Sequence, residues 1–263
     1  MSPLRDESLF GTVDKAADTV ALMRDLEPEE GYYLAFSGGK DSIVLKDLAD
    51  RAGVKYDAHY NVTTIDPPPL VHFIRDRYPT VSWNRPKCAF LTKVGTRGFP
   101  LRHRRWCCSE YKEQSGKNRM IMTGVRKAES SARSRRKVVE VCYRDTSKRF
   151  VHPLIYWTDQ NIWEYIRGNS LPYCHLYDEG FTRLGCLFCP MAKQETRLMQ
   201  AERWPRWRDA FCRAFIRYYE HRAAQEKKTV LDRWASGEEM FDWWLHLDRY
   251  VKGAAEPEET LFQ

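Results

Sequence analysis

The stretch FSGGKDS, which begins at residue 36, combines residue types that bind phosphate. Gly38 and Gly39 can adopt backbone angles that other residues avoid, so that successive N–H groups can converge on one anion. Ser37 and Ser42 add hydroxyl donors, and Lys40 adds a cation. A short apolar run precedes the stretch and a helical pattern follows it, so the positive end of a helix would face the same anion. The sequence therefore predicts a site for a phosphate compound.

The glycine spacing separates this stretch from the Walker loop, whose pattern is G-x-x-x-x-G-K-S/T. Here the two glycines are adjacent, and no upstream glycine stands at the Walker spacing. We therefore do not expect γ-phosphate transfer of the Walker type.

The cysteines point to a second kind of chemistry. RWCCSEYKE contains the adjacent pair Cys107 and Cys108, and LGCLFCP contains Cys186 and Cys189 in a C-x-x-C arrangement. Four thiolates can hold zinc or an iron–sulfur cluster. Because a tandem Cys-Cys is unusual for zinc, the pattern favours iron–sulfur. In a reducing compartment, the even number of cysteines does not imply disulfides.

Composition and charge narrow the class of protein. The 263 residues carry a net charge of +7, and basic residues gather in Arg102–Arg105 and Arg133–Lys137. Each run is either a solvated loop or part of a patch for a nucleotide or a nucleic-acid backbone. No apolar run reaches the roughly 18 residues of a membrane span, and the charged N-terminus does not resemble a signal peptide. We expect a cytoplasmic protein without a membrane partner.

The hydrophobic pattern alternates between short strands and helices over the first three quarters of the chain. It predicts helices over 42–51, 67–78 and 158–167, the last with Thr158 as N-cap. It predicts strands over 32–36, 56–63, 120–125, 138–143 and 150–155. Such alternation predicts an α/β domain with a largely parallel sheet flanked by helices.

The remainder of the chain has a different pattern. Gln194–Lys228 and Met240–Tyr250 carry aromatic residues at helical spacings, which we interpret as packing residues. The sequence thus predicts an α/β domain over residues 1–191 and a helical C-terminal subdomain over residues 192–263.

Two of these motifs resemble those of a known superfamily. SGGKDS resembles the PP-loop of N-type ATP pyrophosphatases, and the cysteine spacing resembles that of adenylylsulfate reductases, which hold a four-iron, four-sulfur cluster. The likeness extends over about residues 32–190. It includes Thr123–Arg126 with Glu129, Ser130 and Arg133, then His152-Pro153-Leu154, DQNIWEYI and LPYCHLYDEGFTRLGCLFCP. The chain is identified as a member of the phosphoadenylylsulfate (PAPS/APS) reductase superfamily. This implies a Rossmann-like, adenine nucleotide alpha hydrolase-like fold.

The resemblance also implies roles for particular residues. ATP with Mg²⁺ would be the nucleotide, and Asp41 is a candidate for contact with the metal. The catalytic residues would be Lys40, Asp41, Arg126 and Arg133. The nucleotide would contact Ser37, Gly38, Gly39, Lys40, Asp41, Ser42, Gly124, Arg126 and Glu129. A [4Fe-4S] cluster would be held by Cys107, Cys108, Cys186 and Cys189, or alternatively by Cys107, Cys174, Cys186 and Cys189.

The sequence departs from the reductases at one point. Those enzymes attack the substrate's sulfur with a cysteine near the C-terminus, but KGAAEPEETLFQ contains none, and Cys212 lies within an expected helix. The remaining features are closest in kind to the ATP pyrophosphatases of DNA phosphorothioation systems (the DndC and SspD type). There, ATP is cleaved to AMP and pyrophosphate to adenylate a backbone phosphate, and a cysteine desulfurase supplies the sulfur.

We therefore expect an ATP pyrophosphatase whose acceptor is nucleic acid, DNA rather than tRNA, with a cysteine desulfurase as partner. Two alternatives stay open. One is a sulfonucleotide reductase of sulfate assimilation, and the other is a non-catalytic nucleic-acid or partner-binding module with a structural cluster.

Overall fold

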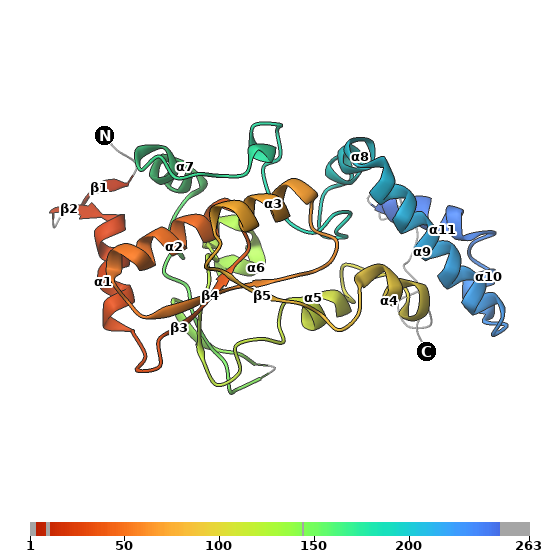
Figure 1. Ribbon diagram of the computed structural model, residues 1–263, viewed down its shortest axis with the longest axis horizontal. Coiled ribbons are helices and arrows are strands. Elements are labelled where there is room, and N and C mark those ends of the chain that lie inside the picture. Colours follow the sequence, from red (N-terminus) through yellow and green to blue (C-terminus); the bar gives the residue numbers. More distant parts are fainter. Residues whose placement is uncertain (1–3, 9–10, 144, 248–263) are drawn as a thin grey trace. The chain divides into compact units, whose positions relative to one another are not determined.

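The computed structural model describes residues 4–8, 11–143 and 145–247 (Figure 1), and it divides into two compact units. Unit 1 consists of residues 1–62, 68–84 and 114–184, and unit 2 of residues 63–67, 85–113 and 185–263. The domain boundary expected between residues 191 and 192 stays a prediction.

The described part of unit 1 contains a six-stranded sheet of order β5-β4-β3-β6-β8-β7. Parallel pairing joins β5 through β8, and β7 runs antiparallel to β8. The strands are β3 (Tyr32–Phe36), β4 (Tyr56–Asn61), β5 (Ser82–Asn84), β6 (Met120–Met122), β7 (Val139–Val141) and β8 (Arg149–Val151). The expected α/β class with a largely parallel sheet is confirmed. Strand β5, which is only three residues long, was not predicted from the sequence.

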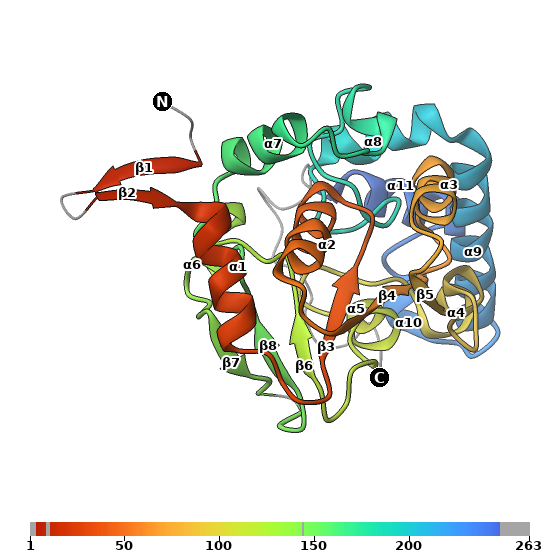
Figure 2. The same cartoon turned by 60° about the vertical axis from the view of Figure 1, so that its left-hand side comes forward.

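Helices cover the sheet, and the best predicted of them follows the glycine-rich stretch. This helix, α2 (Lys40–Ala52), packs against α1 (Lys15–Asp25) and α7 (Asp159–Gly168), and Figure 2 shows α1 and α2 side by side. Thr158 caps α7 as expected, because its side chain accepts the N–H of Asn161 at 3.1 Å.

Shorter elements complete unit 1. They are the hairpin β1 (Arg5–Ser8) and β2 (Gly11–Asp14), α3 (Pro68–Arg77), the 3₁₀ turns η1 (Lys127–Glu129) and η2 (His175–Tyr177), and α6 (Ser131–Ser134).

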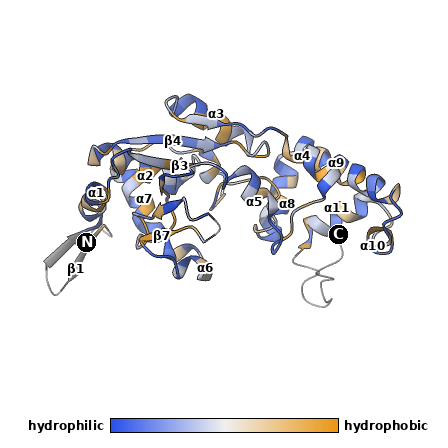
Figure 3. Ribbon diagram, turned by 90° about the horizontal axis from the view of Figure 1, so that it is seen from below, coloured by the Kyte–Doolittle hydropathy of each residue, from blue (hydrophilic) through white to orange (hydrophobic). Residues whose placement is uncertain are grey.

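The edge strand β7 exposes apolar side chains. Val139 and Val141 are 40% and 57% exposed, and Figure 3 shows hydrophobic residues on this strand. The ladder to β8 uses the backbone of Glu140, with further bonds from Cys142 N to Lys148 O and from His152 N to Val138 O. By the alternation of an antiparallel ladder, the N–H and C=O groups of the two valines point to the open edge.

Unit 2 is helical and has an aromatic core. Its described helices are α4 (Phe90–Arg97), α5 (Trp106–Tyr111), α8 (Gln194–Arg203), α9 (Pro205–Ala223), α10 (Lys228–Leu231) and α11 (Gly237–Leu245). The Phe99 ring stacks on Phe215 with centroids 4.6 Å apart, and the Trp244 indole donates to the carbonyl of Pro100 at 2.9 Å. These contacts give the aromatic residues a packing role, as the sequence suggested.

The expected C-terminal helices differ in detail from those observed. The helix expected over 194–228 is divided at Trp204, because Pro205 starts α9 and has no N–H to continue α8. The second expected helix corresponds to α11, and its residues 248–250 lie outside the described residues. Across the described residues, no helix is long and apolar enough to cross a membrane.

Candidate functional site

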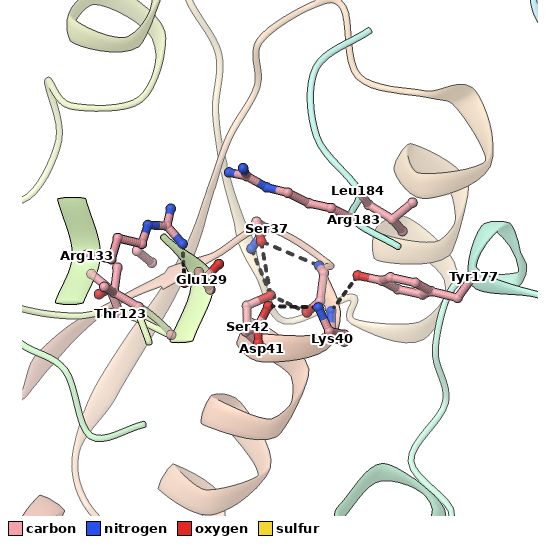
Figure 4. Close-up of a pocket in the computed structure, with 14 residues that line it drawn as sticks. Ser37, Lys40, Asp41, Ser42, Thr123, Glu129, Arg133, Tyr177, Arg183 and Leu184 are labelled. Atoms are coloured by element: carbon pink, nitrogen blue, oxygen red, sulfur yellow. Dashed lines mark hydrogen bonds and ion pairs between the residues drawn. The ribbon is translucent and has the colours of Figure 1, made fainter. Parts of the chain in front are cut away.

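The glycine-rich stretch forms the turn between β3 and α2, at the carboxyl edge of the sheet (Figure 4). Gly38 has φ of +69°, and a Cβ there would lie 2.6 Å from Cγ1 of Ile74, so glycine is required on both grounds. The Ser42 hydroxyl accepts the N–H of Ser37 at 3.2 Å and donates to the carbonyl of Gly39 at 2.9 Å. The side chains thus hold the turn in a fixed shape.

A cavity of about 210 Å³ opens beside this turn, and all of its lining residues belong to unit 1. One wall is the stretch from Ala35 to Ser42, and a second is the segment after β6, from Thr123 to Arg133. The third wall consists of Tyr177, Arg183 and Leu184. Neighbouring parallel strands end at the same edge of a sheet, which is where ligands bind in open α/β folds.

Close backbone approach joins the first two walls. A Cβ at Gly124 would lie 3.1 Å from the backbone and Cβ of Asp41. Gly124 therefore lets the segment after β6 reach the first turn of α2. This gives a structural reason for a glycine at one of the positions expected to contact the nucleotide.

Arg126 lies behind the cavity rather than among its lining residues. Its side chain is buried, with Nε 2.6 Å from Oδ1 of Asp41 and Nη2 3.0 Å from Oδ1 of Asp159. Lys40 Nζ approaches the same Asp159 oxygen at 3.1 Å. These four residues form one ion-pair network beneath the turn. A contact of Arg126 with the nucleotide stays a prediction.

Glu129 and Arg133, both expected at the site, line the cavity and are ion-paired with each other. Glu129 Oε2 also accepts the backbone N–H of Arg126 at 3.0 Å. The carboxylate therefore holds the Arg133 guanidinium while it closes the 3₁₀ turn η1.

Tyr177 and Arg183 line the cavity but were not singled out from the sequence. The Tyr177 hydroxyl accepts the backbone N–H of Lys40, the first residue of α2, at 2.9 Å. Burial raises the pKa of Tyr177, so this hydroxyl stays protonated at neutral pH. Both residues fall within the long segment that carries the family likeness, but no local spacing shows which of its side chains reach the turn.

Behind Thr123, a cavity residue, lies the fully buried His152. Its Nδ1 is 2.6 Å from the Thr123 hydroxyl, and its Nε2 is 3.1 Å from Oε1 of Glu140 and 3.1 Å from Nη2 of Arg136. Burial lowers the pKa of His152, although the neighbouring carboxylate opposes the shift. The imidazole thus fixes the orientation of the Thr123 hydroxyl that faces the cavity.

The paired cysteine motifs both belong to unit 2. Cys107 and Cys108 lie on α5 and are hydrogen-bonded to each other, and Cys107 interacts electrostatically with Cys186 and Cys189. Burial raises the pKa of Cys186 to about 11, opposed by Lys112, which donates to its sulfur. The hydrogen bond from Cys107, aided by Lys112, lowers the pKa of Cys108 to about 6. Four thiols and a cation therefore share one region of the unit.

The C-x-x-C loop has a defined backbone. Phe188 takes a left-handed φ of +52°, and its N–H donates to Oε1 of Gln200 on α8 at 2.7 Å. The N–H of Leu187 donates to the carbonyl of Ile65 at 2.8 Å. Helix α8 thus helps to present Cys186 and Cys189.

These residues have the donor chemistry for an iron–sulfur cluster, because four thiolates with a nearby cation match its charge and its preference for sulfur. Their positions do not form a closed ligand set, since no three Cys, His, Asp or Glu side chains of the described residues stand ready to hold a metal ion. Cys174 lies in unit 1, where it is buried and its pKa is raised by burial. The choice between the two expected ligand sets stays a prediction.

The mostly parallel sheet, with a glycine-containing turn at its carboxyl edge, is the architecture of an adenine nucleotide alpha hydrolase-like fold, and comparison with known proteins agrees. Residues 31–192 match the phosphoadenosine phosphosulfate reductase domain family, and the chain belongs to this family. The adenosine 5'-phosphosulfate reductase of Oceanobacillus iheyensis is 29% identical over 186 residues, which cover 65% of this chain and 75% of that protein. The adenosine 5'-phosphosulfate reductase of Shouchella clausii is 26% identical over 219 residues, which cover 76% of this chain and 88% of that protein.

A solved structure shares the fold. The phosphoadenylyl-sulfate reductase from Candida auris, in its phosphate complex, superimposes with a TM-score of 0.50 at 19% identity, over 65% of this chain and 87% of that one. The predicted superfamily and fold class are thereby confirmed.

Proposed function

We propose that the protein is an ATP pyrophosphatase that adenylates an acceptor for sulfur transfer. The observation that carries this proposal is the turn from Ser37 to Ser42, which places the N-terminus of α2 beside a cavity lined by the cationic residues Lys40, Arg133 and Arg183. An acceptor oxygen would form a bond to the α-phosphorus of ATP. The bond from that phosphorus to the bridging oxygen would break, and pyrophosphate would leave with the electron pair.

The chain's own residues suit the stabilisation of this leaving group. Charge that develops on pyrophosphate would be stabilised by the positive end of the α2 dipole and by Lys40 and Arg133. Both side chains are already oriented by ion pairs, to Asp159 and Glu129 respectively. Arg126 would act as a positioning residue, because it holds Asp41 and Asp159 and does not line the cavity.

Two bound groups belong to the proposal. Mg²⁺ bound with ATP neutralises phosphate charge, and Asp41, at the start of α2, would contact it. A [4Fe-4S] cluster, held by Cys107, Cys108, Cys186 and Cys189, would relay sulfur or stabilise unit 2. The supporting observation is the interaction among those thiols.

The proposed acceptor is a nucleic-acid backbone phosphate, in DNA rather than tRNA. The support is the basic run that starts at Arg133 in the cavity wall and continues through the exposed Arg135 and Lys137. Adenylation would convert a phosphate oxygen, which is a very poor leaving group, into a good one that sulfur can displace. A cysteine desulfurase is the proposed sulfur donor.

Pyrophosphate release tests this proposal. Anaerobically reconstituted protein is incubated with ATP and Mg²⁺, alone and with duplex DNA, single-stranded DNA or tRNA. We expect one pyrophosphate for each ATP consumed, with the AMP moiety recovered on the acceptor or, after hydrolysis, as free AMP, and we expect stimulation by DNA. Absence of pyrophosphate under all of these conditions would overturn the proposal. Salt-sensitive DNA binding without turnover would instead support the non-catalytic module.

A second candidate is sulfonucleotide reduction, which the names of the relatives favour. It requires a reactive thiolate, and Cys212 is poorly suited because it lies on the 19-residue helix α9 and burial raises its pKa. Sulfite release from adenylylsulfate with thioredoxin would establish this activity. Loss of that activity in Cys212→Ser would identify the nucleophile.

A further inference from the structure

We infer that Arg183 and Tyr177 form a terminal-phosphate subsite that makes the cavity select a nucleoside triphosphate over a nucleotide with a single phosphosulfate. The inference deepens the proposed function and rests on it for the identity of the nucleotide. It concerns two residues of the segment LPYCHLYDEGFTRLGCLFCP to which the resemblance gave no role, and it assigns to them the recognition of the β- and γ-phosphates.

The described residues that line the cavity carry more positive than negative charge. Among the described residues that line it, three are cations (Lys40, Arg133 and Arg183) and two are carboxylates (Asp41 and Glu129). Lys40 Nζ lies 3.7 Å from Asp41 Oδ2, in addition to its contact with Asp159, and Arg133 is paired with Glu129. Lys40 and Arg133 are thus each ion-paired with a carboxylate. Arg183 is the cation of the lining that leaves a net positive charge.

Arg183 differs from Lys40 and Arg133 in its exposure and in its contacts. Arg183 is exposed, and within residues 4–8, 11–143 and 145–247 no ion pair or hydrogen bond is found for its guanidinium. Figure 4 shows the Arg183 side chain extended away from its own segment. A phosphate in the cavity would therefore gain this cation without breaking an existing ion pair.

Tyr177 supplies a further hydrogen-bond donor at the turn. Tyr177 accepts the N–H of Lys40, so the first amide of α2 is already hydrogen-bonded. A hydroxyl that accepts one hydrogen bond can still donate its own proton. A phosphate at the turn would therefore accept a hydrogen bond from the Tyr177 hydroxyl, while Arg183 supplies a cation from the same wall of the cavity.

A cation and a hydroxyl donor in one cavity suit a chain of phosphates. Guanidinium binds terminal phosphate oxygens in a two-pronged geometry, which gives specificity as well as affinity. A nucleoside triphosphate presents two phosphates beyond the α-position, whereas adenylylsulfate presents one less highly charged sulfate. Arg183 should therefore contribute to the binding of ATP and pyrophosphate and little to the binding of AMP or adenylylsulfate.

The test compares binding of four probes to three variants by titration calorimetry. The probes are pyrophosphate, an ATP analogue with a methylene bridge between the α- and β-phosphates, AMP and adenylylsulfate. The variants are Arg183→Gln, Arg183→Lys and the matched control Arg77→Gln, which removes an exposed arginine of unit 1 outside the cavity. Circular dichroism checks that each variant is folded.

We expect Arg183→Gln to weaken binding of the ATP analogue and of pyrophosphate about tenfold or more, and binding of AMP and adenylylsulfate less than threefold. Arg183→Lys should retain part of the affinity, and Arg77→Gln all of it. An equal loss for all four probes, no loss for any, or the lack of binding of every probe by the wild-type protein would overturn the inference.

Pyrophosphate release, measured on the same wild-type sample, separates this inference from the proposed reaction. If the analogue binds with the expected dependence on Arg183 but no pyrophosphate is released, the reaction fails and the subsite stands. If pyrophosphate is released equally fast by wild type and Arg183→Gln at limiting ATP, the reaction stands and the subsite fails.

Discussion

Nε of Arg126 lies 2.6 Å from Oδ1 of Asp41, and this contact joins the segment after β6 to the first turn of α2. The guanidinium is almost fully buried and also contacts Asp159. The pair therefore fixes two walls of the cavity relative to each other, whatever the ligand.

Replacement of this arginine should be costly. Arg126→Met leaves the carboxylate of Asp41 without its main partner, and we expect the free energy of unfolding to fall by about 3 kcal/mol, as for a broken buried ion pair. Urea unfolding followed by circular dichroism measures the change. Arg126→Lys, which keeps the charge, should lose less, and equal stability of Arg126→Met and wild type would contradict the role.

Two glycines with nearly the same backbone angle allow a matched test of the turn. Gly38 and Gly53 have φ of +69° and +68°, but a Cβ at Gly53 would meet nothing within 4 Å, whereas at Gly38 it would collide with Ile74. Gly53→Ala should cost about 1 kcal/mol, from the left-handed backbone alone. Gly38→Ala should cost at least about 1 kcal/mol more, because overpacking is added. Equal costs in urea unfolding would show that the close contact is relieved without penalty.

Burial of His152 predicts a pH dependence of stability. Its pKa is lowered in the folded protein, so below the ordinary value of about 6.5 the unfolded chain binds a proton that the folded chain does not. Stability should therefore decrease as the pH falls from 7.5 to 5.5, and His152→Gln should show about 1 kcal/mol less decrease than wild type. Glu140, whose pKa is also lowered, titrates below this range. Parallel curves for the two proteins would refute the assignment.

Two single substitutions distinguish the possible cluster ligands. With Cys107, Cys108, Cys186 and Cys189 as ligands, Cys108→Ser should lower the iron content and the absorbance near roughly 400 nm, and Cys174→Ser should change neither. The alternative set predicts the opposite result. Iron analysis and spectra of anaerobically purified protein provide the measurement, with Cys186→Ser, which both sets predict to be defective, as the positive control.

The basic run should determine binding of nucleic acid. The double variant Arg135→Glu/Lys137→Glu is expected to weaken binding of labelled single-stranded DNA more than tenfold at low salt and to flatten its salt dependence. Lys55→Glu/Arg77→Glu reverses the same number of exposed charges in unit 1. If fluorescence anisotropy shows equal weakening by both double variants, net charge rather than this surface determines binding.

The parts of the site that could be predicted from sequence are those encoded locally. The apolar run before FSGGKDS and the helical pattern after it predicted β3 and α2 within two residues at each end. The two glycines predicted the turn, because few other residues adopt the left-handed backbone angles that Gly38 has there. Strand β5 was missed because three residues carry too little pattern, and its strand character depends on pairing with β4.

The parts that could not be predicted depend on contacts between distant segments. Tyr177 is 137 residues away from Lys40 in the chain, and no spacing rule relates the two. Arg126 belonged to a recognised motif, but the sequence could not show that Asp41 and Asp159 would surround it. The residue type of the cysteine motifs was enough to predict thiolate ligands. The contact between Lys112 and Cys186 could be seen only in the folded structure.

The open edge at β7 has a practical consequence for handling the protein. Two outward-pointing valines with free backbone groups are a template for pairing with another chain, and the short length of the strand and the adjacent Arg135 and Lys137 oppose such pairing. Concentrated salt screens that repulsion. The protein should therefore be most soluble in buffers of modest ionic strength. At high salt, aggregation would begin by pairing of β7 edge strands from different molecules.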